Sequence, residues 1–248
     1  MKKLTLFTAL AISLTVSLGL SAAAEKHTPQ SLAIQSAPNS SLVVAELFTS
    51  QGCSSCPPAE QLFSTLAEEE DVLTLEWHVD VWDTLVHGGS RWKDPYSSKS
   101  FTDRQRAYNI SIRGQTGIYT PQAVVNGQFE GVGSRPAEVS DMLENVSRLT
   151  VGVNIKNDNV SVAASAQSAD ILFLRLLKQH ETDIKGGENK GRKLAGKNIV
   201  LEATVLGKTG AETKNLKLPA IGEEETCAVL IQKLDGELSP ILGAAKCA

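Results

Sequence analysis

The sequence predicts an α/β domain over residues 41–149, followed by a small all-β domain over residues 150–248 with an antiparallel, sandwich-like architecture. Before residue 150, apolar patterns of strand and helix period follow one another in the order strand, helix, strand, helix, hairpin, helix. After residue 150, short strand-like runs are separated by turn signals, without a convincing helical pattern. Hydrophobic residues make up 42% of the 248-residue chain, which is enough for a sizeable core and excludes a wholly disordered chain.

The first strand and the first helix frame a pair of cysteines. Residues Leu42–Phe48 form a short apolar run suited to a strand buried on both faces. A helix is expected after Cys56, with Pro57 and Pro58 in its first turn and Glu60 on its polar face. The apolar face of this helix consists of Ala59, Leu62, Phe63, Leu66 and Ala67.

The remaining elements of this domain follow in order. Residues Leu73–Val79 alternate apolar and polar side chains, which predicts a second strand. Ser100, with Asp103 three residues later, resembles a capping box that opens a second helix. Asn126-Gly127 between apolar runs predicts a two-residue hairpin turn, and a last helix is expected to begin at Ser134.

The strand-like runs after residue 150 are short and separated by Asn-, Asp- and Gly-containing turns. They are Val151–Ile155, Val160–Val162, Ile171–Leu177, Ile199–Leu206, Leu216–Leu218 and Ala228–Ile231. Between them, Lys185–Lys193 is polar and glycine-rich, which predicts a solvated connector, with a partner site as the alternative.

The N-terminus has the pattern of a secretory signal peptide. Lys2 and Lys3 precede the apolar stretch Leu4–Leu20, and three alanines end at Ala24, where we expect cleavage. Residues 1–24 are therefore assigned to the signal peptide and residues 25–40 to a flexible leader. An uncleaved membrane anchor is the alternative, although the stretch is short and contains Thr and Ser. The prediction is export, to the periplasm in a Gram-negative source, without stable membrane insertion after cleavage.

The formal net charge of −4 offers no basic surplus, so nucleic acid is not an expected partner.

Cys53-Ser54-Ser55-Cys56 carries the clearest chemical signal. A Cys-x-x-Cys sequence at the start of a helix brings two sulfurs within bonding distance, and the helix N-terminus stabilises a thiolate. We assign Cys53 as the nucleophile and Cys56 as the thiol that resolves a mixed disulfide. This assignment requires the sulfur of Cys53 to be within reach of outside partners. The alternatives are an inert disulfide and a metal site.

The other two cysteines, Cys227 and Cys247, flank a turn near Asp235-Gly236, where a hairpin places them opposite each other. We predict a structural disulfide between them, which suits an exported protein. A second redox pair that relays electrons to Cys53 is the alternative.

Several segments resemble one family across nearly the whole mature chain. They are Val43–Ala59, His78–Asp83, Trp92–Pro95, Phe101–Tyr108, Tyr119–Gly127, Glu188-Asn189, Gly191-Arg192, Leu194 and Cys227–Leu230. The chain is similar to the exported, thioredoxin-like proteins grouped as domain of unknown function 1223. The resemblance implies a thioredoxin fold for residues 41–149 but no substrate. Ser54-Ser55 stands where many reductants have Gly-Pro, so the direction of electron flow is open.

Further residues are candidates for the same site. Thr120-Pro121 stands where thioredoxin-like folds place a cis-proline facing the cysteines, whereas an ordinary trans-proline is the alternative. With a cis bond, Thr120 can offer its backbone groups to an extended substrate, so Thr120 and Pro121 are expected to bind substrate. Glu46 is a candidate proton carrier beneath the cysteines, or else a strand-edge or salt-bridged glutamate. His78 and Trp82 are candidates for substrate contact, with His78 expected on the non-core face of its strand; a structural histidine is the alternative.

These residues together predict an exported thiol–disulfide oxidoreductase that acts on protein or small-molecule thiols and exchanges electrons with an unknown redox partner. The cysteines are themselves the redox group, so no cofactor is expected. A copper or zinc binding or delivery protein that uses Cys53, Cys56 and His78 is the alternative. A third interpretation is a non-catalytic module whose β-rich part binds a partner.

Overall fold

The computed structural model describes residues 42–235 and 238–247. The predicted signal peptide (residues 1–24) and leader (residues 25–40) lie outside the described residues, so both stay predictions. None of the described helices is long and apolar enough to cross a membrane.

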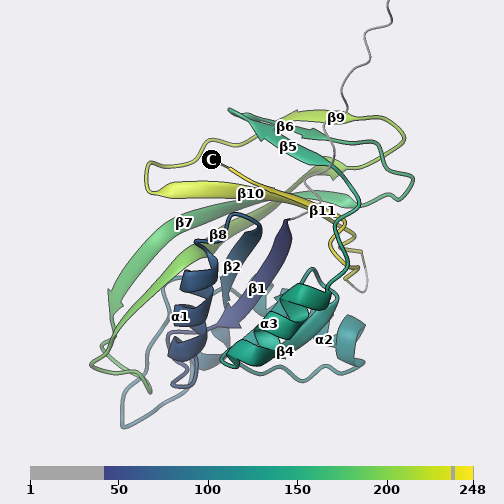
Figure 1. The fold of residues 1–248 in the computed structure, drawn as a ribbon. Helices are drawn as coiled ribbons and strands as arrows, with labels where there is room; N and C mark the ends of the chain where they lie inside the picture. The colour runs from purple at the N-terminus through teal and green to yellow at the C-terminus, as the bar shows by residue number, and fades with distance from the viewer. Residues whose placement is uncertain (1–41, 236–237, 248) are drawn as a thin grey trace, which may run out of the picture. The chain divides into compact units, whose positions relative to one another are not determined.

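The first half has the predicted order of elements (Figure 1). They are β1 (Val43–Thr49), α1 (Pro57–Leu66), β2 (Val72–His78), the short 3-10 helix η1 (Asp80–Trp82), α2 (Lys99–Arg113), β3 (Gln122–Val125), β4 (Phe129–Val132) and α3 (Pro136–Asn145). The β3–β4 hairpin turns at Asn126 and Gly127, both at positive φ, as the Asn-Gly pair predicts. The start of α2 differs from the expectation, because Ser98 rather than Ser100 caps this helix through its hydroxyl.

The second half consists of strands, as expected. They are β5 (Val153–Lys156), β6 (Asn159–Val162), β7 (Asp170–Asp183), β8 (Lys193–Lys208), β9 (Lys214–Lys217), β10 (Glu225–Gln232) and β11 (Gly243–Lys246). Strands β7 and β8 form a long antiparallel hairpin whose tip is the segment between residues 183 and 193.

Most strands join one mixed sheet in the order β11-β10-β7-β8-β2-β1-β3-β4, and β5-β6-β9 form a second, antiparallel sheet. Strands β7, β8, β10 and β11 thus extend the sheet of the first half, so the strands after residue 150 do not form the separate all-β unit that was expected. Strands β1 and β2 are parallel, and the seam between β2 and β8 contains one parallel pair, Glu76 with Ile199. Strands β5 and β6 of the second sheet pack over β7, β10 and β11 of the large sheet (Figure 1).

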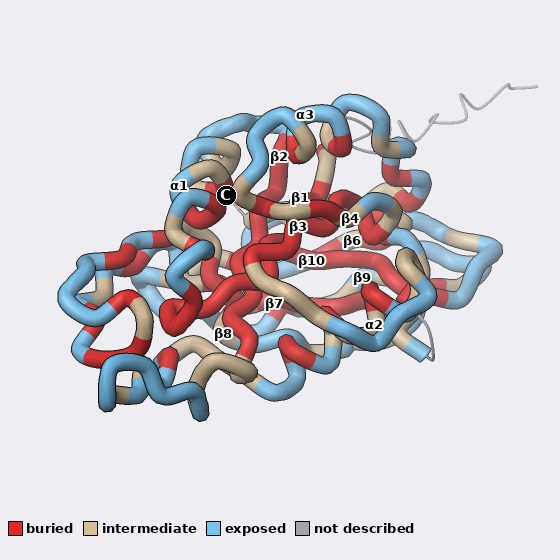
Figure 2. Tube along the Cα trace, turned by 90° about the horizontal axis from the view of Figure 1, so that it is seen from below, coloured by how far each residue is buried: buried red, intermediate tan, exposed pale blue. Residues whose placement is uncertain are grey.

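The core follows from these layers. On one face of the sheet, Ala45 and Leu47 of β1 pack against α1 and α3. On the other face, Phe48 and Trp77 pack against Phe101 and Tyr108 of α2. Figure 2 shows the resulting buried stretches along β1, β2, β7 and β10. The C-terminal end of β1, where the cysteine turn begins, is therefore held from both faces.

The predicted disulfide between Cys227 and Cys247 is present and joins β10 to the end of β11. It closes a loop of 20 residues. We expect Cys227→Ala/Cys247→Ala to lower the free energy of unfolding by about 3 kcal/mol, because the variant loses this constraint on the unfolded chain. Urea unfolding followed by circular dichroism measures the loss. The matched Cys53→Ala/Cys56→Ala variant opens a much shorter loop, so an equal or larger loss there contradicts the prediction.

Candidate functional site

Cys53 and Cys56 form a disulfide in the turn between β1 and α1, with their Cα atoms 5.5 Å apart. Cys56 is the N-cap residue of α1, and Pro57 and Pro58 take the first two helical positions, where no backbone N–H is required. The predicted junction of strand, cysteine pair and helix is confirmed. Neither cysteine lies inside the helix, however, because the helix begins only after Cys56.

Two hydroxyl groups face the sulfur of Cys53. The Thr120 hydroxyl donates a hydrogen bond to this sulfur over 3.2 Å, and the Ser55 hydroxyl lies 3.3 Å from it. The indole N–H of Trp82 donates to the Thr120 oxygen over 2.9 Å, which directs the Thr120 proton toward the sulfur. The Thr120–Pro121 peptide bond is cis, as predicted. The fold thus brings Thr120, Pro121 and Trp82 to Cys53, together with Ser55, whose side chain was not predicted to contribute.

Both cysteines are buried, with an exposed fraction of 0%. The expectation that outside partners reach the sulfur of Cys53 directly is therefore wrong for this structure. Ser54 and Ser55, between the cysteines, are exposed, so solvent reaches the turn but not its sulfurs.

The tip of the β7–β8 hairpin holds the cysteine turn. The side-chain amide of Asn189 donates hydrogen bonds of 2.9 Å to the carbonyl oxygens of Gln51 and Cys53. The backbone N–H of Ser54 donates to the Glu188 carboxylate, also over 2.9 Å. Asn189 is fully buried, so this part of Lys185–Lys193 is a packed structure rather than the predicted solvated connector. We call residues 184–192 the hairpin tip.

A small cavity of about 130 Å³ adjoins the cysteine turn. It is lined by Gly52, Trp82, Leu85, Val86, His87, Trp92, Gly187 and Glu188. Leu85 and Val86 have exposed fractions of 52% and 58%, which leaves apolar surface beside this cavity. The cavity walls therefore come from the cysteine turn, from residues 82–92 after β2 and from the hairpin tip.

The predicted proton carrier Glu46 is buried on the β1 face that packs against α2. Its carboxylate forms an ion pair with Nε of Arg104 at 2.8 Å and accepts a hydrogen bond from the Tyr108 hydroxyl. The salt-bridged alternative therefore describes Glu46. Its contacts tie β1 to α2 and do not include either cysteine.

Glu60 is a buried carboxyl near the cysteines that sequence reasoning placed on the polar face of α1. It lies one helical turn after Cys56, and its Oε1 accepts a hydrogen bond of 2.7 Å from the Thr49 hydroxyl. Burial raises the pKa of Glu60 above its ordinary value, which favours the protonated form. The spacing of four residues from Cys56 is the signal that identifies this position.

His78 is fully buried, which corrects its expected place on the non-core face of β2. Its Nδ1 lies 2.7 Å from Oδ2 of Asp94, and the same carboxylate oxygen accepts the backbone N–H of Gln51 over 2.8 Å. Burial by itself lowers the pKa of His78. The nearby Asp94 carboxylate outweighs this effect and raises the pKa to about 9. His78 is thus linked to the cysteine turn through Asp94.

The predicted alternative metal ligands Cys53, Cys56 and His78 do not form a group within the described residues. Instead, a ligand atom of His78 lies within 4.8 Å of ligand atoms of Glu76 and His180. Burial lowers the pKa of His180 to about 4 and raises that of Glu76 well above its usual range.

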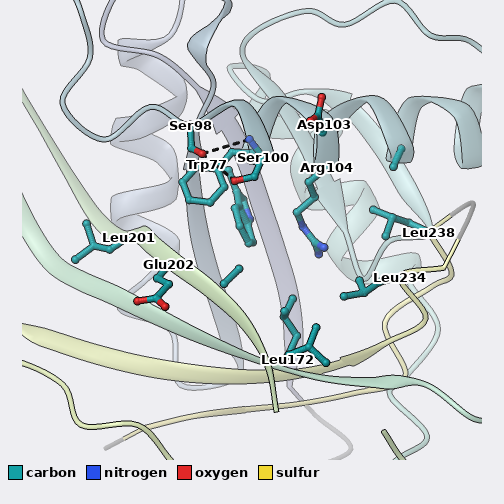
Figure 3. A pocket seen from close by; sticks show the side chains of 14 residues that line it. Trp77, Ser98, Ser100, Asp103, Arg104, Leu172, Leu201, Glu202, Leu234 and Leu238 are labelled. Carbon is teal, nitrogen blue, oxygen red and sulfur yellow. Dashed lines mark hydrogen bonds between the residues drawn. The ribbon is translucent and has the colours of Figure 1, made fainter. Parts of the chain in front are cut away.

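A larger cavity of about 480 Å³ lies between α2 and β8, away from the cysteine turn (Figure 3). Trp77, Leu172 and Leu201 contribute apolar surface to it, and Arg104 extends from α2 toward the strands. Neither cysteine lines this cavity.

The chain is similar to known proteins in sequence and in fold. The sequence profile of a family described as "Protein of unknown function (DUF1223)" matches residues 44–232. A crystal structure of a protein from Agrobacterium tumefaciens is similar, with 30% sequence identity and a TM-score of 0.68. The similarity covers 86% of this chain and 95% of that one. No curated protein matches the sequence.

Proposed function

The chain belongs to the family of proteins of unknown function DUF1223, and within that family we propose that it is an exported thiol–disulfide oxidoreductase with Cys53 and Cys56 as its redox pair. The observation that carries the proposal is the environment of Cys53. Its sulfur is bonded to Cys56 and receives a directed hydrogen bond from Thr120. Such donors favour the anionic form of the sulfur once the disulfide is reduced.

The arrangement of the first half supports a thioredoxin-like assignment of residues 41–149. The strands lie in the order β2-β1-β3-β4, with β1 and β2 parallel and β3 antiparallel to β1. The cysteine turn follows β1, and a cis-proline precedes β3. These features support the thioredoxin fold that the family resemblance implies.

The reaction is thiol–disulfide exchange. The Cys53 thiolate attacks a substrate disulfide, forms a mixed disulfide with one half and releases the other half as a thiolate. The Cys56 thiolate then attacks the Cys53 sulfur, re-forms the Cys53–Cys56 bond and releases the second half. Two electrons pass to the substrate, and an external dithiol reduces the pair again. The same steps in reverse oxidise a dithiol substrate.

We assign the proton transfer to Glu60 rather than Glu46. Cys56 must lose its proton before it attacks the mixed disulfide, and Glu60 is a buried carboxyl one turn further along α1. Because burial raises the pKa of Glu60, this carboxyl comes closer in acidity to a thiol, which suits proton exchange between them.

The substrate is expected to approach over the apolar surface beside the small cavity. Leu85 and Val86 are exposed there, and Trp82 connects the cavity wall to Thr120. Because both sulfurs are buried, exchange requires the hairpin tip or the Thr120 side chain to move first. Candidate substrates are proteins or small molecules with a thiol or disulfide, in the periplasm if the source is Gram-negative.

The test is a trapping experiment. In Cys56→Ser the resolving thiol is absent, so mixed disulfides with Cys53 are expected to accumulate with cystine-containing substrates and to be visible by mass spectrometry. Cys53→Ser, with Cys56 intact, is expected to form none and to lose disulfide turnover. The proposal fails if both variants trap substrate equally, or if wild-type protein neither reduces a disulfide nor oxidises a dithiol.

A further inference from the structure

Three side chains from two strands converge in the interior beside the cysteine turn. Glu76 and His78 are two residues apart on β2, so their side chains lie on the same face of the sheet. His180 comes from β7, on the far side of β8. All three are buried, and one ligand atom of each lies within 4.8 Å of the others.

The three side chains can meet because the residue between them on β8 is a glycine, which has no side chain. Gly196 of β8 pairs with His180. A Cβ atom built on Gly196 lies only 2.3 Å from Oε2 of Glu76 and 3.1 Å from Nε2 of His180. Any other residue would therefore occupy the space into which these two ligand atoms point.

The orientation of both imidazole rings is set by their other nitrogen. Nδ1 of His78 hydrogen bonds to the Asp94 carboxylate over 2.7 Å, and Nδ1 of His180 hydrogen bonds to the Thr182 hydroxyl over 3.1 Å. Nε2 of His78 lies 4.0 Å from Oε2 of Glu76, and Nε2 of His180 lies beside Gly196, as Oε2 of Glu76 does. A carboxylate on the other ring nitrogen, as Asp94 provides for His78, is a usual support for a metal-binding histidine.

Two of the converging atoms lack a hydrogen bond. Nε2 of His78 and Oε2 of Glu76 are buried and find no hydrogen-bond partner among the described residues. They lie 4.0 Å apart, which is too far for a hydrogen bond to each other. Because buried polar atoms are normally satisfied, this pair points to a bound group between them.

We propose that Glu76, His78 and His180 bind one zinc ion. Two imidazole nitrogens and one carboxylate oxygen form a ligand set that zinc accepts. Ligand atoms about 2 Å from a tetrahedral zinc ion are roughly 3.3 Å apart, so small side-chain rotations from the present separations close the site. With the ion bound, the carboxylate charges of Glu76 and Asp94 balance its two positive charges, because binding displaces the protons of the ligand atoms.

The ion joins two parts of the large sheet. In the seam between β2 and β8, a single pair of residues is in register, Glu76 with Ile199. A zinc ion held by β2 and β7 spans β8 and fastens this seam. Since Asp94 also holds the backbone of Gln51, the ion steadies the turn that carries Cys53. The site is distinct from the cysteine pair and does not depend on the proposed redox function.

Zinc content and thermal stability test the site in the full chain. Protein exchanged against a chelator and then loaded with zinc is expected to retain one equivalent after dialysis, with a Tm at least about 5 °C above that of the chelated protein. Cobalt in place of zinc is expected to give visible absorption without a thiolate charge-transfer band. These measurements need no variant, and failure to retain zinc overturns the proposal.

Variants locate the ligands. His180→Gln and Glu76→Gln are expected to lose at least tenfold in zinc affinity, whereas His87→Gln, at an exposed histidine, retains it. Cys53→Ser/Cys56→Ser is expected to retain zinc, although this variant has no redox pair. Loss of zinc in the cysteine variant, or full affinity in both ligand variants, overturns the assignment. Redox activity measured in the same variants tests the proposed function separately.

Discussion

Arg104→Met is expected to lower the free energy of unfolding by about 3–5 kcal/mol. Arg104 forms a nearly buried ion pair with Glu46, and its guanidinium also bonds to Tyr108 and Gln232. It lies over the ring of Trp77 at 4.8 Å. The methionine leaves the Glu46 carboxylate buried without its countercharge, which is the costly part of the change. Urea unfolding monitored by tryptophan fluorescence measures the loss.

Two further variants separate the ion pair from a general effect on α2. Arg106→Met removes a partly exposed arginine of the same helix that pairs with Asp103, and a change below about 1 kcal/mol is expected. Glu46→Gln/Arg104→Met removes the uncompensated charge, so this double variant is expected to be more stable than Arg104→Met alone. If Arg104→Met and Arg106→Met cost the same, the buried pair is not the reason.

Asn189→Ala is expected to speed reduction of the Cys53–Cys56 disulfide about tenfold. The Asn189 amide makes two buried hydrogen bonds to the cysteine turn, and its oxygen accepts one from Arg192. Loss of two such bonds costs the closed state roughly 1–3 kcal/mol, which raises the population of open molecules. Reduction by a water-soluble phosphine, followed by alkylation and mass spectrometry, gives the rate.

Two controls show whether Asn189→Ala changes the access of the reductant to the Cys53–Cys56 disulfide. Lys190→Ala alters the neighbouring exposed residue of the hairpin tip, and the reduction rate is expected to stay within twofold of wild type. The Cys227–Cys247 disulfide, followed in the same samples, is expected to keep its rate in both variants. An unchanged Cys53–Cys56 rate in Asn189→Ala means that the hairpin tip does not limit access to the sulfurs.

The parts of the site that could be predicted from sequence depend on signals within a few residues. Cys53, Cys56 and the two prolines that follow place a Cys-x-x-Cys turn before a helix, because proline is accepted only in the first helical turn. Asn126-Gly127 predicts the hairpin, because its turn requires positive φ. In each case the backbone chemistry of neighbouring residues is sufficient.

The carboxyl groups show where this kind of reasoning ends. Glu46 and Glu60 were assigned from strand and helix patterns, yet one pairs with Arg104 of α2 and the other is buried beside Thr49. The spacing of apolar residues along a strand or helix predicts which face a side chain lies on, but not which element covers that face. The side of the sheet on which α2 lies is decided by the packing of Phe101 and Tyr108 against β1 and β2.

The sequence by itself determined the order of the elements, the cysteine turn and the Cys227–Cys247 bond, because each depends on local spacing or on a short hairpin. Only the tertiary structure decided that Asn189 covers the turn of Cys53 and that His180 meets His78. These partners are more than 100 residues apart in the chain, so no local pattern links them. They meet because the long β7–β8 hairpin extends the sheet of the first half and returns its tip to the cysteine end.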